Sequence, residues 1–380
     1  MSAYVKSSLS SLTVREEERA NQPAKKSGGY SIVTLSSAEA IRGLKEAARQ
    51  LMPLYDPMLD PHYFLASLSK EWAPRVVVVR SGPDLVGIIY AKERKVWGIP
   101  TGIVRINQTL SDALLGRSGN TKEILSLAVE SLLGLPRTLS VELKLPAGLE
   151  LDASSEHWPA KSVQVRSSWL KDHHAHLALP PTYDEFLNVL GSSSRHNFRY
   201  YRRRFESAGH RYVAHLPLEL LSSVTWELKK KCSLPNQAEV IERCLEMVAA
   251  ADTPLAVGLQ HSNGEWVSVA AGCYRPGQAL VLFQLNSDQD FARSSLSVVL
   301  RSFMIENLIQ AGCPELVIFG GTVPPLSRYV THPPTMNVHV DKLMYSWRAL
   351  RFLGRVIGPR LPKQFSSYTL RHEQGFTDDV

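Results

Sequence analysis

The sequence has few cysteines and no long hydrophobic run. Four cysteines occur among 380 residues without the C-x-x-C spacing of zinc and redox sites, so we expect reduced thiols at Cys232, Cys244, Cys273 and Cys313. No segment offers the roughly 18 consecutive apolar residues of a transmembrane helix. Residues 1–29 lack the apolar centre of a secretory signal, and we expect them to be disordered. These absences favour a cytoplasmic protein.

Several familiar active-site patterns are also missing. The chain has no P-loop, no dinucleotide-binding fingerprint and no convincing Ser-His-Asp order. His173, His174 and His176 form an HHAH run, but no third ligand accompanies them, so we predict no metal site. What the chain does have is an excess of positive charge, +7 with a pI of about 9.2, which favours an anionic partner. A phosphorylated cofactor, a nucleic acid and an acidic lipid surface all satisfy this.

The composition is that of a globular protein, and the length accommodates two domains. Both halves carry the same order of expected elements: helices, a three-stranded antiparallel meander, a helix and a strand. In the first half we expect helices at 37–51, 62–68 and 121–133 and strands at 76–79, 85–91, 101–106 and 138–143. In the second half we expect helices at 183–207, 218–250 and 295–310 and strands at 174–179, 255–260, 266–274, 279–286 and 316–319.

The parallel is clearest in the second strand of each meander, SGPDLVGIIYAKE against SNGEWVSVAAGCY. We therefore predict an α/β fold with mixed sheets in two tandem domains. Their junction falls within residues 146–165. The predicted ranges are a disordered segment at 1–29, a first domain at 30–160, a second at 161–340, and a basic helix and tail at 341–380.

Two segments of the second half carry a family resemblance. LALPPTYDEFLNVLGSSSRHNFRYYRRRFESAG (177–209) and DQDFARSSLSVVLRSFMIENLIQAGCPELVIFGG (288–321) resemble the acyltransferase domain of the CelD-like and FemAB-like branch of the GNAT superfamily. The resemblance implies two GNAT-like halves, with a degenerate first half and an active second half. It also implies N-acyl transfer from acyl-CoA to an amine.

The resemblance implies a CoA site at the start of the helix expected at 295–310. A helix N-terminus offers unpaired N–H groups and partial positive charge to a pyrophosphate. The family usually has glycine where this chain has Ser297. The candidate cofactor-binding residues are Arg293, Ser294, Ser295, Leu296 and Ser297, with Leu285 and Asn286 on the preceding strand. The loop from Gly116 to Thr121 is an alternative CoA position, because it also precedes a helix and contains two glycines.

Acyl transfer requires an oxyanion donor, a base for the amine and an acid for the leaving thiolate. The resemblance implies a backbone oxyanion donor near residues 285–287. Asp288 and Asp290 follow that strand and are candidate bases, and Tyr329 is the candidate acid.

A basic helix supplies the candidate substrate-binding residues. Arg195, Asn197 and Arg199 fall at characteristic positions of the family, and spacings of three and four put Arg195 and Arg199 on one helix face together with residue 202 or 203. Aromatic residues interleave with the arginines, which also suits stacking with single-stranded nucleic acid.

Other readings stay open. The basic helix suits a FemAB-like transferase that uses aminoacyl-tRNA, and it equally suits a non-catalytic module that binds nucleic acid. Residues 342–363 form a basic amphipathic pattern, which packs on the second half or contacts an anionic membrane.

Overall fold

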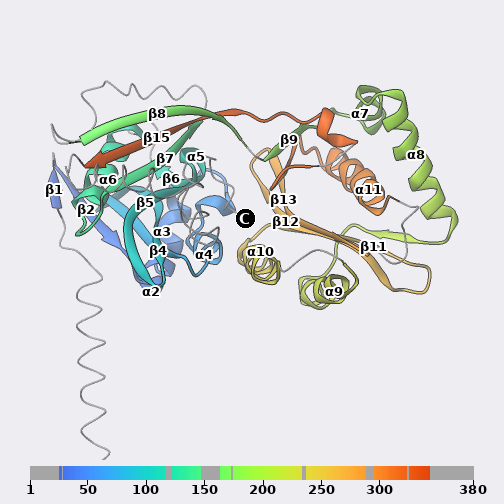
Figure 1. Cartoon of the computed structure of the whole chain (residues 1–380), viewed down its shortest axis with the longest axis horizontal. Helices are drawn as coiled ribbons and strands as arrows, with labels where there is room; N and C mark the ends of the chain where they lie inside the picture. The colour runs from blue at the N-terminus through green and yellow to red at the C-terminus, as the bar shows by residue number, and fades with distance from the viewer. Residues whose placement is uncertain are drawn as a thin grey trace, which may run out of the picture. The chain divides into compact units, whose positions relative to one another are not determined.

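The computed structural model describes residues 25–27, 29–116, 121–146, 163–172, 174–232, 237–287, 295–322 and 325–342. The chain forms two compact units. The first unit contains Met1–Pro53, Met58–Lys171 and Pro334–Asp379, and the second contains Leu54–Pro57 and Asp172–Pro333. Each unit is a mixed α/β structure with its own sheet (Figure 1).

The first unit has a nine-stranded sheet. Its main path runs in the order β1 (Lys25–Ser27), β2 (Tyr30–Leu35), β3 (Trp72–Ser81), β4 (Asp84–Val96), β5 (Ile99–Thr109), β7 (Ser140–Pro146), β15 (Pro334–Lys342) and β8 (Val163–Lys171). A short strand, β6 (Leu114–Gly116), pairs with β4 outside this path. Only β5 and β7 are parallel among these pairs.

Side chains alternate along the strands, so the two faces of this sheet carry different residues. Val104 and Val141 point to one face, where α6 (Thr121–Gly134) completes an apolar core. Arg105 and Glu142 point to the opposite face and form a buried ion pair at 3.1 Å. On the remainder of that face, a second apolar cluster joins β3 and β4 to α2 (Ala38–Arg42), α3 (Lys45–Leu51) and α4 (Pro61–Ala66).

The second unit has a six-stranded sheet. Its order is β10 (Arg211–Val213), β11 (Pro254–Gln260), β12 (Trp266–Arg275), β13 (Gln278–Asn286), β14 (Glu315–Ile318) and β9 (Ala175–Ala178). The meander β11–β12–β13 turns at Gly264 and Gly277, whose φ angles of +89° and +72° suit glycine. The pair β13–β14 is parallel, as expected when a helix connects the two strands.

Helices cover both faces of this second sheet (Figure 1). On one face lie α7 (Tyr183–Val189), α8 (Ser192–Ser207) and α11 (Leu296–Gln310), which share an apolar core with the strands. On the other face lie α9 (Leu218–Lys231) and α10 (Ala238–Ala250). Phe186 and Phe198 are fully enclosed where α7, α8 and α11 meet the sheet.

Three expected helices are each divided in two. The helix expected at 183–207 is interrupted at Leu190 and Gly191, whose ψ angles of 140° and 156° are extended. The helix expected at 218–250 ends at Cys232, which is also extended. The helix expected at 37–51 breaks at Gly43. A uniform 3.6-residue periodicity continues across a short break, so the pattern did not indicate these ends.

The units also differ from the expected ranges. β8 and β15 pair with each other and belong to the first unit, although residues 163–171 and 334–340 were expected in the second domain. Asp341 and Lys342 are the end of β15, not the start of a helix. Residues 343–380, where the basic helix was expected, lie outside the described residues, as do residues 1–24.

Two sequence features have simple structural counterparts. All four cysteines are free. Among the described residues, no helix has the length and apolar character needed to cross a bilayer.

Gly272 is required by the close approach of β12 and β13. A Cβ at Gly272 would lie 1.8 Å from the Leu280 carbonyl oxygen, whereas a Cβ at Gly134, at the end of α6, would meet nothing within 4 Å. We expect Gly272→Ala to lower the free energy of unfolding by about 1–3 kcal/mol through overpacking. Gly134→Ala is the control and should be neutral or slightly stabilising. Urea denaturation measures both, and equal effects would contradict this account.

Candidate functional site

The candidate site of the second unit begins where β13 loses its partner. Parallel pairing with β14 covers only Ala279–Val281, opposite Leu316–Ile318. The Phe319 N–H then donates to the Val281 carbonyl at 3.0 Å, and the chain turns at Gly320 and Gly321 with φ angles of +71° and +87°. β13 continues to Asn286. From residue 282 to 286 this edge of β13 has no paired strand among the described residues.

The backbone of β13 presents donors to this unpaired edge. The Ser287 N–H donates to the Val267 carbonyl at 2.9 Å, on the side of β12. Because N–H groups alternate in direction along a strand, the N–H groups of Asn286 and Gln284 point to the other side. A register shift between β12 and β13 at Ala271/Gly272 determines which residues of β13 turn their N–H groups away from β12. The unpaired edge therefore offers two backbone donors.

Polar side chains form a network next to this edge. The Ser268 hydroxyl donates to Asn286 Oδ1 at 2.7 Å, and Gln284 Nε2 donates to the same oxygen at 3.1 Å. From α11, Arg301 Nε donates to Gln284 Oε1 at 3.0 Å. Arg301 Nη1 donates to Thr322 Oγ1 at 2.6 Å. The network thus joins β12, β13, α11 and the segment after β14.

Arg301 is a candidate site residue that the sequence did not indicate. It is 8% exposed, and this burial lowers the pKa of its guanidinium to about 10. The available signal was a single cation in the apolar run of α11, LSVVLRSFMI. Periodicity alone assigned that position to an ordinary helix face.

The predicted CoA-binding residues are only partly described. Asp288, Asp290, Arg293 and Ser294 lie outside the described residues. Ser295 precedes α11 and makes no side-chain cap, while its carbonyl accepts from the N–H groups of Val298 and Val299 at 2.8 and 3.0 Å. Ser297 is half-buried in the first turn. The site role of these residues stays a prediction.

Leu296 and Leu285 contribute packing at this point. Both side chains are buried, at 3% and 2% exposure. A role in cofactor binding would therefore have to use their backbone. Asn286, by contrast, joins the polar network and is half-buried.

The arginines of the predicted basic face of α8 fall into two groups: some bond to neighbouring elements, and others are exposed. Arg195 donates to Asn188 Oδ1 at 3.3 Å and to the Leu190 carbonyl at 3.2 Å, across the turn between α7 and α8. Arg202 pairs with Glu306 at 2.6 Å and lies 4.2 Å from the Phe303 ring, which ties α8 to α11. Arg199 is exposed and Asn197 is half-buried. Of the predicted substrate-binding residues, Arg199 is thus the cation most available to a ligand.

Tyr329 contacts the start of α8. Its hydroxyl accepts from the Gly191 N–H at 2.7 Å, and Ser194 Oγ lies 3.5 Å away. The contacts with Ser194 and Gly191 favour the phenolate and lower the pKa of Tyr329. The direction suits a group that exchanges a proton, but the hydroxyl also holds the end of a helix. Its role as an acid stays a prediction.

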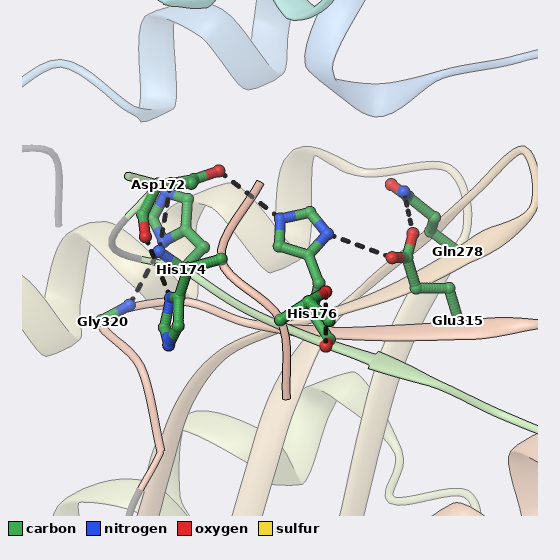
Figure 2. A network of polar contacts seen from close by, with 8 residues as sticks. Asp172, His174, His176, Gln278, Glu315 and Gly320 are labelled. Carbon is green, nitrogen blue, oxygen red and sulfur yellow. Dashed lines mark hydrogen bonds and ion pairs between the residues drawn. The ribbon is translucent and has the colours of Figure 1, made fainter. Parts of the chain in front are cut away.

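Two histidines of the HHAH run, His174 and His176, take part in a separate set of polar contacts, which Figure 2 shows, and His173 lies outside the described residues. His176 Nδ1 lies 3.1 Å from Glu315 Oε1, its Nε2 lies 3.4 Å from Asp172 Oδ2, and Gln278 donates to Glu315. His174 Nδ1 accepts from the Gly320 N–H at 3.3 Å. Two histidines are thus held by carboxylates and backbone. No three potential ligands among the described residues group around a metal position.

Comparisons with known proteins give the fold. No protein-family model matches the chain, and no curated protein matches it. Among solved structures, FemX is similar over 79% of this chain and 95% of its own, with 11% identity and a TM-score of 0.53. The C-terminal domain of a putative lysylphosphatidylglycerol synthetase from Agrobacterium fabrum is similar over 84% of this chain and 97% of its own, with 12% identity and a TM-score of 0.51. The predicted fold of two GNAT-like halves is confirmed.

His176 should make stability depend on pH. Its interaction with Asp172 raises the pKa of His176, burial opposes this, and Glu315 adds to the increase. A pKa above the unfolded value of about 6.5 stabilises the fold fully below that pH, and the contribution is lost as pH rises through the folded pKa. We expect His176→Gln to destabilise most near pH 5.5 and less at higher pH, measured by urea denaturation. Glu315→Gln should lower the His176 titration midpoint in NMR. A pH-independent loss would argue for packing alone.

Proposed function

We propose that this chain, which has a tandem GNAT-like fold, is an N-acyltransferase that moves an acyl group from acyl-CoA to an amine in its second unit. The observation that carries the proposal is the unpaired edge of β13, where Gln284 and Asn286 turn backbone N–H groups away from β12. A thioester carbonyl placed against this edge would find preorganised donors for the oxyanion that forms during transfer.

The start of α11 supports the placement of the donor. The Ser295 side chain does not cap the first N–H groups of this helix, and the apolar side of the helix is fixed in the core by Leu296. A pyrophosphate at a helix N-terminus gains from these N–H groups and from the helix dipole. Ser297 is compatible with this contact through its small side chain and backbone. Asp288 or Asp290 as the base and Tyr329 as the acid complete the proposed chemistry.

The first unit lacks an equivalent opening in its described part. Its corresponding strand is β5, which is parallel to β7 at Ile103–Arg105 and again at Thr109. Directly after Thr109 the chain forms α5 (Leu110–Ala113), which packs against β5 and β7. The space beside this strand is thus occupied by the chain itself. Gly116 and Thr121 flank the alternative CoA loop, whose residues 117–120 lie outside the described residues.

A second candidate donor is an aminoacyl-tRNA. The exposed side of α8 favours it, because Arg199, Arg203 and Arg204 are accessible there. The rings of His196 and Tyr200 stack beside them, with centroids 5.8 Å apart. Cations with aromatic rings suit a single-stranded 3′ end. Consumption of labelled aminoacyl-tRNA would favour this donor, and salt-dependent binding without turnover would favour a non-catalytic module.

The cytoplasmic location also remains a proposal.

The CoA contact can be tested at the start of α11. We expect acetyl-CoA or a longer acyl-CoA to raise the melting temperature of the wild type, and Ser295→Glu to abolish the increase by placing negative charge against the pyrophosphate. Ser192→Glu is the matched control, because it adds the same charge at the exposed start of α8. Differential scanning fluorimetry measures both variants. No shift with any acyl-CoA would contradict the CoA assignment.

The oxyanion donor can be tested by removing one backbone N–H. Asn286→Pro deletes the N–H at an edge without a strand partner, where proline is tolerated. Asn286→Ala removes the side chain alone and is the control. We expect turnover of Asn286→Pro to fall about 100- to 1,000-fold below Asn286→Ala. Thiol release from acyl-CoA in the presence of amines measures the rates. Equal rates in folded variants would exclude this donor.

A further inference from the structure

Arg301 carries a buried charge that the proposed chemistry does not use. Its side chain extends from α11 between Gln284 on β13 and Thr322 after β14. Both partners are neutral. Within the described part of the chain, no Asp or Glu pairs with Arg301. A full positive charge therefore lies beside the unpaired edge of β13 without a countercharge among these residues.

Such an arrangement is costly, because a buried charge loses hydration and gains no ion pair. Burial lowers the pKa of Arg301 to about 10, so the guanidinium remains a cation at neutral pH. Two other buried or half-buried arginines have carboxylate partners: Arg202 has Glu306 at 2.6 Å, and Arg105 has Glu142 at 3.1 Å. The half-buried Arg195 is bonded to the neutral Asn188 and to a carbonyl, as Arg301 is bonded to neutral groups. Arg301 lacks this compensation where the proposed substrate would enter.

The hydrogen bonds of Arg301 leave one donor group available. Nε and Nη1 are engaged by Gln284 and Thr322 and fix the guanidinium plane. Nη2 has no hydrogen-bond partner among the described residues. Nη2 is not fully enclosed by the protein, so it keeps contact with solvent. The cation is thus held in place with one nitrogen free to meet a ligand.

We infer that Arg301 is a specificity-determining residue that binds a carboxylate of the substrate beside β13. The inference rests on the proposed function, which brings the substrate to this edge. One guanidinium balances the single charge of a carboxylate and binds it through a charge-assisted hydrogen bond. A phosphate monoester carries up to two negative charges and would leave an excess. Amino-acid-like acceptors hold a carboxylate next to the reacting amine, and dicarboxylic acyl groups hold one on the donor.

The test compares ligand pairs that differ in the carboxylate. L-alanine with L-alaninamide, and L-lysine with L-lysinamide, probe the acceptor side, and succinyl-CoA with acetyl-CoA probes the donor side. Binding to the full chain is measured by calorimetry and thermal shift. We expect the wild type to prefer the carboxylate member on one side. Arg301→Met should reduce that preference about 10- to 100-fold, the range for a hydrogen bond to a charged group.

Two further variants separate binding from folding. Without ligand, Arg301→Met should melt at the wild-type temperature or higher, because an unpaired buried charge is removed. Arg202→Met is the matched control; it should lower the melting temperature by leaving Glu306 unpaired and keep the carboxylate preference. Arg301→Lys retains the charge without the two fixed hydrogen bonds and should keep part of the preference. Arg301→Lys also tests the carboxylate preference if Arg301→Met does not fold.

Each outcome bears on the inference. Equal binding of both members of every pair would overturn it, and so would an unchanged preference in Arg301→Met. Stronger competition with the carboxylate ligand by inorganic phosphate than by acetate would also overturn it. A carboxylate preference that depends on Arg301, without any acyl-CoA shift, would support the site and count against the CoA-dependent function. An acyl-CoA shift with no carboxylate preference would support the transferase and overturn the role of Arg301.

Discussion

The short parallel pairing of β13 and β14 is the constraint on which the site depends. Three residues of each strand pair before the chain turns at Gly320 and Gly321. Strand backbone that loses its partner must find another hydrogen-bonding group or water. Pairing with β12 fixes which N–H groups of β13 point away from β12 and which of its side chains face α11. Where β14 diverges from β13, these N–H groups are left without a strand partner. The proposed oxyanion donors, the polar network and the position of Arg301 all depend on where the pairing of β13 and β14 stops.

The charge distribution around this edge agrees with a site for an anion. Arg202 and Arg105 are half-buried or buried and have carboxylate partners. Arg301 is buried and bonded to neutral partners, and its fixed geometry means that little entropy is lost when a ligand binds. A residue that lowers stability and is nevertheless held rigidly is expected at a functional site, where the substrate supplies the missing charge.

Local sequence patterns predicted the parts of the fold that depend on local interactions. The meander of the second unit follows from apolar strands separated by Ser262-Asn263-Gly264 and Arg275-Pro276-Gly277, and its turns are observed at Gly264 and Gly277. The pairing of β15 with β7 and β8 joins residues almost 200 positions apart, such as Val340 and Val141, and no local pattern contains that information. The family resemblance directed attention to the start of α11. It did not indicate Arg301, because its significance depends on what surrounds it in space.

The two units show how one element order gives different chemical possibilities. Both contain a meander, a helix and a parallel strand, yet α5 follows β5 directly and packs against β5 and β7. In the second unit, β13 ends at Asn286 and the next described helix begins at Leu296. No described strand pairs with the edge from residue 282 to 286, and the Cys232 thiol donates to the Asn286 carbonyl at 2.7 Å. Glycine content alone would have favoured the loop from Gly116 to Thr121 as the phosphate site. Under the proposed function, a bound phosphate can present a thioester for reaction only where an unpaired strand edge lies within reach, and this requirement favours the second unit.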